Sequence, residues 1–358
     1  MTKLIIPAAG QSTRYGLSRP KFLLQHPKGT TMLTAGLLGL RGLEVDEVIV
    51  VSLSEFFESI SQESVKTELI EHFGCNVNLV LLDKPTPSMV DTIAAGIQTM
   101  QNDDAIIVKD TDNYIEVSDL RALQGDFLTY ADLRSFPEVK AHNKSFIESD
   151  SQSFVSNIVE KKIISSEINT GLIGFSRASY FLRAMKALQG TGERYVSDVV
   201  RYLLSEGENF VAVPAKDYID WGTLAEWRSY CSKFATVFVD VDGVIAVNEN
   251  PHGTGTNNWS TFRSIDENIA PLVDGQNKGN LTIVFTTSRS EKYRDLLTSQ
   301  IELAGFKGFT LVMGLPHAKR LLINDFANTN PYPTALAINL ERNARNLSSY
   351  LNPLFPQD

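Results

Sequence analysis

The sequence has few cysteines and few histidines, which limits the kinds of site that it can encode. Its two cysteines, Cys75 and Cys231, are too few and too far apart for a disulfide framework. The five histidines are scattered, and no Cys-x-x-Cys pair or His/Cys cluster indicates zinc. We therefore expect neither disulfide cross-links nor a zinc site.

Positive charge is also scarce. The chain has 33 Lys and Arg against 42 Asp and Glu, a net charge of −9. This balance argues against nucleic acid or an anionic membrane as a partner. Nucleotide binding stays open, because it needs only a few local cations and backbone N–H groups.

Long apolar runs are missing as well. No stretch reaches the roughly 18 apolar residues that a membrane helix needs. The apolar run near the start ends at Pro7, which is too short for a signal peptide. These features predict a cytoplasmic protein without a membrane partner. The oligomeric state cannot be read from the sequence, and a homo-oligomer stays open.

What is present is a pattern of short apolar runs that alternate with longer helix-like stretches. This alternation predicts parallel α/β architecture, and the length of 358 residues suggests about two domains. We place the domains at 1–232 and 233–358, with no Gly/Pro/Ser-rich linker between them. Expected strands are 3–7, 47–52, 77–82, 105–109, 210–214, 237–240, 281–286, 309–313 and 320–323, and expected helices include 89–100, 194–206, 289–304 and 340–351.

The first expected strand runs into a loop of small residues and is followed by two cations. Gly10 permits backbone geometry that other residues avoid, and Ser12 and Thr13 can donate hydrogen bonds to phosphate oxygens. Arg14 offers a planar fork for phosphates, and Lys21, after a proline, offers a point charge. An ordinary strand–helix turn is the alternative, but the two cations at these spacings favour a nucleoside triphosphate site.

The stretch PAAGQSTRYGLSRPK resembles the signature of the sugar-phosphate nucleotidyltransferases, the pyrophosphorylase family. The resemblance continues at residues 108–113, 159–161, 169–171 and 219–223 and covers about residues 1–228. Gln11 and Thr13 depart from the commonest pattern, which puts the choice of base and acceptor in doubt. The resemblance implies a Rossmann-like fold with a mixed, mostly parallel sheet.

The resemblance also implies roles for individual residues. Asp112 and Asp220 correspond to the carboxylates that hold Mg²⁺, with Mn²⁺ as a substitute, and Asp110 assists them. Lys161 corresponds to the lysine that holds the acceptor phosphate, although a solvated surface lysine is the alternative. Ala8, Ala9, Gly10, Ser12, Thr13, Ser88, Thr170 and Gly171 correspond to nucleotide- and substrate-binding positions, and Arg14 and Lys21 to catalytic ones. For the loop 84–88, which contains Ser88, a plain proline-rich turn is the alternative.

These parts predict one reaction. A phosphomonoester oxygen attacks the α-phosphorus of an NTP, for which CTP or UTP is favoured, and pyrophosphate leaves. The acceptor is expected to be a phosphorylated sugar or polyol. The protein supplies positioning and charge neutralisation and needs no covalent intermediate.

The second half opens with another phosphorus signal. An apolar run ends in Asp240-Val241-Asp242-Gly243, which resembles the first motif of the haloacid dehalogenase superfamily of phosphatases. Thr287 and Lys319 follow in the order of the later motifs, and the resemblance spans about residues 234–350. It implies a Rossmannoid domain, and the stretch between Asp242 and Thr287 is too short for a large cap.

By role, Asp240 would be the nucleophile that forms an aspartyl-phosphate, and Asp242 would serve as general acid and base. Thr287 and Lys319 would hold the phosphoryl group, although Lys319 could also be an ordinary surface lysine. Asp240, Asp242 and Asp325 would hold Mg²⁺. Asp325 follows Asn324 rather than a second acid, which leaves the metal affinity uncertain.

Together the two signals predict a bifunctional enzyme of activated-sugar or activated-polyol metabolism, in keeping with surface-polysaccharide precursor synthesis. A chain with one active domain and a non-catalytic nucleotide-sugar sensor or scaffold are the alternatives. The order of the reactions and the identity of both substrates cannot be read from the sequence.

Overall fold

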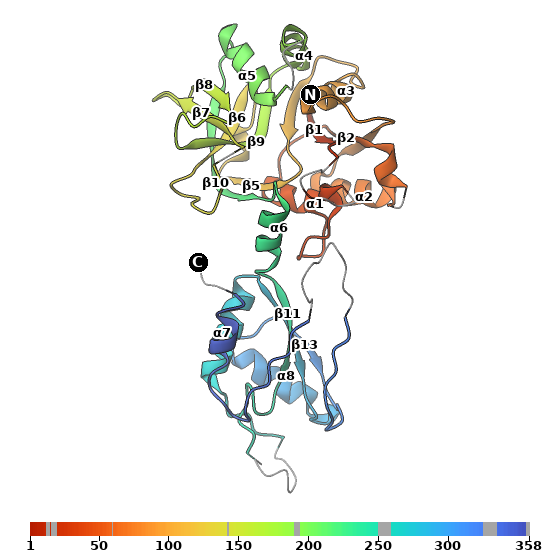
Figure 1. Ribbon diagram of the computed structural model, residues 1–358. Coiled ribbons are helices and arrows are strands. Elements are labelled where there is room, and N and C mark those ends of the chain that lie inside the picture. The colour runs from red at the N-terminus through yellow and green to blue at the C-terminus, as the bar shows by residue number, and fades with distance from the viewer. Residues whose placement is uncertain are drawn as a thin grey trace. The chain divides into compact units, whose positions relative to one another are not determined.

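The computed structural model describes residues 1–11, 15, 20–58, 60–141, 143–189, 194–249, 259–324 and 335–355. The chain divides into two compact units, Met1–Trp227 and Arg228–Asp358 (Figure 1). The division falls within helix α6 (Leu224–Cys231). Among the described residues, no helix is long and apolar enough to cross a membrane.

The first unit is built on one mixed sheet of ten strands. The order β3-β2-β1-β4-β9-β6-β10-β5 starts with four parallel strands, and β9 then runs antiparallel to β4 and β6. A side branch joins β7 and β8 to β9. The strands are β1 (Thr2–Ala8), β2 (Glu47–Leu53), β3 (Asn76–Leu82), β4 (Ala105–Lys109), β5 (Asn113–Val117), β6 (Phe127–Asp132), β7 (Ser145–Ser149), β8 (Val155–Glu160), β9 (Glu167–Phe175) and β10 (Val211–Asp220).

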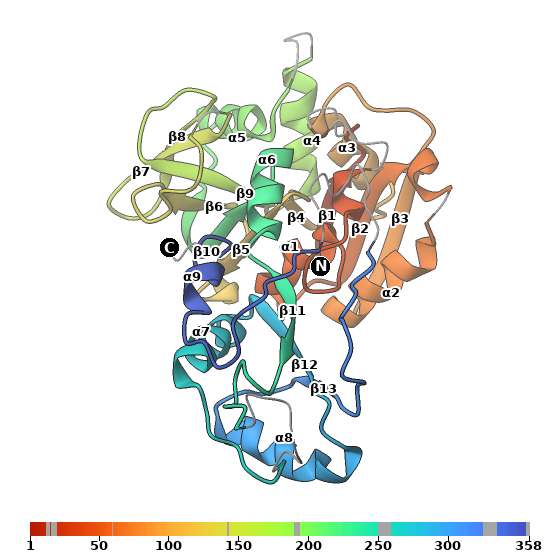
Figure 2. The same cartoon turned by 60° about the horizontal axis from the view of Figure 1, so that its bottom comes forward.

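Helices cover both faces of this sheet, as Figure 2 shows. One face carries α3, α4 and α5, and the other carries α1 and α2. The helices are α1 (Met32–Leu37), α2 (Gln62–Phe73), α3 (Met89–Ile97), α4 (Ala178–Ala187) and α5 (Val196–Ser205), with 3-10 turns η2 (Lys21–Leu23), η3 (Leu38–Leu40), η4 (Ser54–Phe57) and η5 (Leu120–Ala122).

Strand β1 shows why this sequence folds between two helical layers. Ile5 packs into the cluster on the α3 face, whereas Leu4 and Ile6 pack into the cluster on the opposite face. All three side chains are fully buried. A run of apolar residues without polar alternation is typical of a parallel strand that is covered on both sides. The strands expected in this unit are confirmed, and β10 is longer than predicted.

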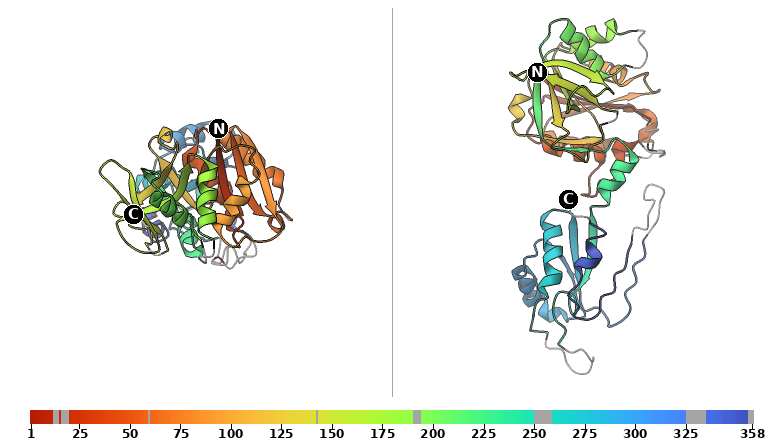
Figure 3. Two further views of the ribbon diagram at one scale, coloured as in Figure 1. Left: turned by 90° about the horizontal axis from the view of Figure 1, so that it is seen from above. Right: turned by 60° about the vertical axis from the view of Figure 1, so that its left-hand side comes forward.

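The second unit contains a smaller parallel sheet in the order β11-β12-β13 (Figure 3, right). Its core joins apolar residues of these strands to α7 and α8. The elements are β11 (Ala235–Asp240), β12 (Leu281–Thr286), β13 (Thr310–Val312), α7 (Asp266–Asn277), η6 (Glu291–Tyr293), α8 (Arg294–Leu303) and α9 (Ser348–Leu351).

The strand that the sequence predicts at 320–323 does not form. Leu321, Leu322 and Ile323 are instead 79%, 57% and 85% exposed and have no strand partner. The connection from β13 to Arg320 is shorter than the dozen or so residues that a parallel crossover needs. The apolar run alone therefore gave a wrong prediction.

Two helix predictions in this unit also need correction. The predicted helix 340–351 is confined to α9, because Asn343 has a φ of 62° and its side chain bonds the backbone of Asn248. The predicted helix 289–304 begins only at Arg294. Arg289 lies in a turn in which its backbone N–H donates to Thr287 Oγ1.

Candidate active site

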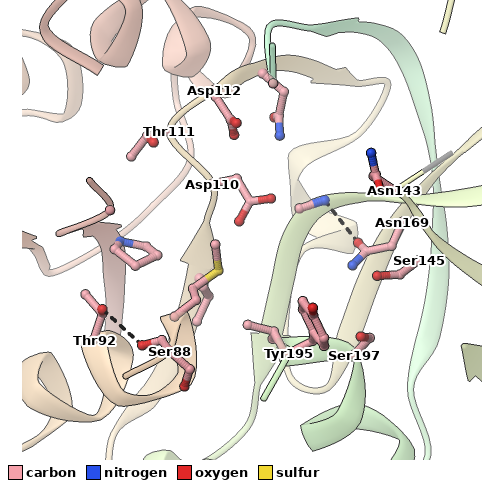
Figure 4. A pocket seen from close by; sticks show the side chains of 18 of the residues that line it. Ser88, Thr92, Asp110, Thr111, Asp112, Asn143, Ser145, Asn169, Tyr195 and Ser197 are labelled. Carbon is pink, nitrogen blue, oxygen red and sulfur yellow. Dashed lines mark hydrogen bonds between the residues drawn. The ribbon is translucent and has the colours of Figure 1, made fainter. Parts of the chain in front are cut away.

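A cavity of about 810 Å³ opens in the first unit at the carboxyl ends of β1 and β4. Figure 4 shows Asp110 and Asp112 between Ser88 and Thr92 on one side and Asn143 and Asn169 on the other. Predicted site residues that line the cavity are Ala8, Ala9, Gly10, Lys21, Ser88, Asp110, Asp112, Lys161, Thr170, Gly171 and Asp220. The structure thus brings together predicted residues from distant parts of the sequence.

Strand register explains why the three aspartates meet. Lys109 pairs with Leu172 across β4 and β9, so Asp110 lies opposite Gly171, and its N–H donates to the Gly171 carbonyl at 2.9 Å. Asp220 pairs with Asn113 across β10 and β5, which brings Asp220 beside Asp112. The sequence motifs become one site because these pairs fix their relative positions.

Gly171 is required by this close approach. Its φ is 76°, in the region that favours glycine, and a Cβ at this position would lie 2.2 Å from Asp110 Oδ2. Any larger residue would displace the Asp110 carboxylate. The glycine therefore positions a candidate metal ligand through the backbone of β9.

Lys21 forms an ion pair with Asp112. Both side chains are 18% exposed, and Lys21 begins the 3-10 turn that follows Pro20. Burial alone would raise the pKa of Asp112, but Lys21 and its hydrogen bond lower it to about 2. Asp112 is therefore ionised at neutral pH.

Asp220 is held by a second lysine. Lys144 Nζ lies 2.6 Å from Asp220 Oδ2 and donates to the Tyr218 hydroxyl at 3.2 Å. The Asp220 side chain is only 9% exposed. Burial would lower the pKa of Lys144, but Tyr218, Asp220 and Asp112 together raise it, so this ammonium is charged.

The oxygen atoms of Asp112 and Asp220 suit a hard divalent cation. A Cβ on Gly222 would lie 3.2 Å from Asp220 Oδ1 and 3.6 Å from Asp112 Oδ2, so both carboxylates border the space that glycine leaves open. Among the described residues, no group of three His, Cys, Asp or Glu forms a complete metal site. Mg²⁺ commonly binds through one or two carboxylates and takes its other ligands from water and phosphate.

A third lysine, Lys109, forms hydrogen bonds within the turn that contains Asp110 and Asp112. Lys109 is fully buried, and its ammonium donates to Asn113 Oδ1 at 2.6 Å and to the Asp110 carbonyl at 2.7 Å. Burial lowers the pKa of Lys109 to about 8, against the attraction of Asp110 and Asp112. Its contacts fix the turn between β4 and β5.

One half of the cavity has the polar groups expected of an acceptor site. Lys161 has a φ of 57°, and its ammonium donates to the Tyr195 hydroxyl at 2.6 Å. Glu160 accepts hydrogen bonds from Ser145 and, at 2.8 Å, from Ser197. These contacts leave a fixed carboxylate beside the predicted phosphate-binding lysine.

The opposite half contains the proline-rich loop before α3. Ser88 caps α3, and its hydroxyl donates to Asp91 Oδ2 at 2.6 Å. Arg194 Nη2 bonds the other oxygen of Asp91 at 2.5 Å, so the loop is tied to the chain ahead of α5. Thr86 and Thr92 share a hydrogen bond of 2.5 Å.

One predicted residue has its polar group directed into the protein, and three others lie outside the described residues. The Thr170 hydroxyl is buried and bonds Thr129 at 2.5 Å. Ser12, Thr13 and Arg14 lie outside the described residues.

Sequence reasoning gave no role to Lys144, Glu160 or Arg194. Glu160 is adjacent to Lys161 in a motif that was singled out, and this was a usable signal. Lys144 and Arg194 are single cations in loops, which carry no pattern of their own.

In the second unit, Asp240 ends β11 and Thr287 follows β12. Thr287 Oγ1 lies 3.1 Å from Asp242 Oδ2, so these two predicted residues meet at the carboxyl edge of the sheet. Arg289, which is 2% exposed, binds Asp242 at 2.7 Å and was not predicted to have a role. Among the described residues, Asp242 is therefore paired with a buried cation.

The structure leaves the predicted roles of Lys319 and Asp325 as predictions. Lys319 is exposed, and Asp325 lies outside the described residues. Loss of hydration and Asp242 raise the pKa of Asp240, whereas Arg320 and His317 oppose this rise.

Comparison with known proteins agrees with the architecture of the first unit. Residues 4–130 match the MobA-like NTP transferase domain. The bifunctional protein GlmU of Leifsonia xyli subsp. xyli (strain CTCB07) is 27% identical over 234 residues, which is 60% of this chain and 45% of that protein. The chain thus spans less than half the length of this relative.

Two solved structures share the fold. The nucleoside-diphosphate-sugar pyrophosphorylase from Vibrio cholerae RC9 has a TM-score of 0.54 and 18% identity, covering 63% of this chain and 98% of that chain. A UDP-glucose pyrophosphorylase complexed with UDP-glucose has a TM-score of 0.51 and 15% identity, covering 65% of this chain and 99% of that chain. The N-terminal part of the chain is therefore similar to the MobA-like NTP transferase domain over residues 4–130 and has the mixed α/β, Rossmann-like fold of these structures.

Proposed function

We propose that the first unit transfers a nucleotidyl group from an NTP to a phosphorylated sugar or polyol and releases pyrophosphate. The observation that supports this most strongly is the pairing of Lys21 with Asp112, beside Asp220, in a cavity of about 810 Å³. This volume lies within the usual range of ligand pockets, so the cavity has room for a nucleotide and a small acceptor.

Each residue has a stated part in this reaction. Asp112 and Asp220, assisted by Asp110, would hold Mg²⁺ or Mn²⁺. When bound, the ion neutralises phosphate charge. Lys21 binds the α-phosphate, whose charge grows as it is attacked, and Arg14 binds the leaving phosphates. No side chain forms a bond to phosphorus.

Substrate positions follow from the two halves of the cavity. Ala8, Ala9, Gly10, Ser12 and Thr13 would contact the nucleotide, and Ser88 would lie beside its base, with CTP or UTP preferred. Lys161 would bind the acceptor phosphate, while Thr170 and Gly171 border the acceptor. Both substrates then lie against the same aspartates, which aligns the attacking oxygen with phosphorus.

A matrix of the four NTPs against a panel of sugar and polyol phosphates tests this proposal, with pyrophosphate release as the readout. We expect release with one preferred pair, dependence on Mg²⁺ or Mn²⁺, and complete loss in excess EDTA. Release without an acceptor, full activity in EDTA or tightly held zinc would contradict the proposal.

We further propose that the chain has two functional domains, 1–232 and 233–358, and that the second hydrolyses phosphomonoesters. The meeting of Asp242 and Thr287 beside Asp240 favours this activity. Asp240 attacks phosphorus and the alcohol leaves with a proton from Asp242, which then activates water to release phosphate. Lys319 and Asp325 would complete the phosphate and Mg²⁺ sites.

The two activities would serve one cytoplasmic pathway, such as surface-polysaccharide precursor synthesis. The short insert at residues 248–262 would give the phosphatase its specificity. His252 of this insert lies outside the described residues, and Trp259 packs edge-on against Tyr293, with ring centroids 5.8 Å apart. We expect the phosphatase substrate and the transferase acceptor to be related sugars or polyols. A phosphatase that prefers nucleotides or phosphoproteins would contradict this coupling.

A further inference from the structure

Lys144 is a charged group of the cavity to which the proposed reaction gives no part. It precedes β7, and its carbonyl accepts the backbone N–H of Lys161 at 2.9 Å. This bond fixes the start of the Lys144 side chain on the acceptor side. Its ammonium reaches Asp220, and the side chain is 17% exposed.

The ammonium binds one oxygen of the carboxylate whose other oxygen borders the space proposed for a divalent cation. Lys144 Nζ lies 2.6 Å from Asp220 Oδ2, within the distance of a direct ion pair. Asp220 Oδ1 and Asp112 Oδ2 face the space beside Gly222. An ammonium and a divalent cation on one carboxylate repel each other strongly in a site that is largely shielded from water.

Lys144 has room to move away, because it lines the cavity. Lysine carries a compact charge on a flexible four-carbon stem, and the stem here starts from a fixed backbone. Movement toward the cavity would bring the ammonium to the half that contains Lys161 and Glu160. Anionic substrate groups would stabilise it there.

We propose that Lys144 is a positioning residue that holds Asp220 in the metal-free protein and leaves it when a divalent cation binds. The exchange keeps Asp112 and Asp220 from repelling each other before the cation arrives. It then directs a positive charge toward the anionic acceptor. This inference rests on the nucleotidyl-transfer function proposed above, because that reaction brings a divalent cation to these carboxylates.

Binding of Mn²⁺ alone to the full chain, followed by electron paramagnetic resonance, tests the exchange. Lys144→Met removes the competing ammonium, so we expect about tenfold tighter binding, the effect of losing one charge-assisted hydrogen bond. Lys216→Met is the matched control, because Lys216 pairs with Glu116 at 2.5 Å but does not line the cavity. Asp220→Asn should abolish the signal of bound Mn²⁺, which would assign that signal to the site at Asp220.

Chemical labelling of the wild-type protein gives a second readout that needs no variant. Reductive methylation, read by mass spectrometry, should modify Lys144 several-fold faster with Mn²⁺ than without it, while Lys216 is unchanged. Unchanged or slower labelling of Lys144 would overturn the proposal, as would equal or weaker Mn²⁺ affinity in a folded Lys144→Met protein.

These outcomes separate the inference from the function on which it rests. Pyrophosphate release together with unaltered Mn²⁺ binding in Lys144→Met would contradict the exchange alone. The expected Mn²⁺ and labelling results without pyrophosphate release from any substrate pair would contradict the function and support the exchange.

Discussion

The two units place the same short motif, Asp-x-Asp, at the end of a parallel strand, but they surround it differently. In the first unit Asp110 and Asp112 follow β4, and β10 adds Asp220. In the second unit Asp240 and Asp242 lie at the end of β11, and the partner of Asp242 is the buried Arg289. The motif decides where carboxylates lie, and the neighbouring strands decide what they face.

The cations around the two motifs differ in their surroundings. Lys21 and Lys144 pair with Asp112 and Asp220 at the wall of an 810 Å³ cavity, where a substrate can compete for them. Arg289 instead makes a forked contact with Asp242 and also donates to the backbone at Trp259. The first arrangement suits exchange of cations, and the second holds one carboxylate in place.

The largest expected effect is that of a substitution in the second unit, which should remove one proposed activity and spare the other. Asp240→Asn removes the proposed nucleophile and should reduce phosphomonoester hydrolysis by more than about 10⁴-fold. Nucleotidyl transfer should stay near the wild-type rate. Phosphate release at a substantial fraction of wild type would exclude the covalent mechanism.

Substitutions in the first unit should have the opposite selectivity and reduce nucleotidyl transfer alone. Asp112→Ala and Lys21→Ala should each reduce pyrophosphate release by about 10²–10³-fold, because each removes a fixed charge from the transition state. Phosphomonoester hydrolysis, assayed in the same preparation, should persist. Equal loss of both activities would show that the two sites are not independent.

The next prediction concerns the stability of the first unit and its dependence on pH. His26 is 2% exposed and packs against Trp221, with ring centroids 5.4 Å apart. Burial, with a smaller contribution from Lys28, lowers the pKa of His26 to about 4 from an ordinary value of 6.5. The unfolded chain therefore binds a proton between these pH values that the folded chain does not, and stability falls as pH falls through this range.

The full effect amounts to about 3 kcal/mol at pH 4. His26→Gln should remove most of this pH dependence, which denaturant unfolding at pH 7 and pH 4.5 would measure. If the variant loses as much stability as the wild type over this range, His26 is not the group responsible.

The smallest expected effect concerns the proposed metal site of the first unit. Gly222→Ala would place a methyl group 3.2 Å from Asp220 Oδ1 and narrow the space between Asp220 and Asp112. We expect a several-fold rise in the Mg²⁺ concentration needed for half-maximal pyrophosphate release, with thermal stability nearly unchanged. An unaltered Mg²⁺ requirement would indicate that the ion binds elsewhere.

Local signals in the sequence were sufficient to predict the strands that lead into both Asp-x-Asp motifs. The strands that precede Asp110 and Asp240 are apolar runs that end in an acidic turn, and both occur where expected. Lys144 could not be found in this way, because its role depends on strand pairing far along the chain. The predicted strand at 320–323 failed for the same reason, since an apolar run does not reveal whether a partner edge is within reach.

The central claim is that the first unit breaks the bond between the α- and β-phosphates of an NTP and passes the nucleotidyl group to a phosphomonoester. Phosphorus NMR of one reaction, with the preferred NTP and acceptor, observes this directly. We expect equal amounts of pyrophosphate and a diphosphodiester product. Formation of a nucleoside diphosphate and inorganic phosphate, or of a free nucleoside monophosphate, would contradict it.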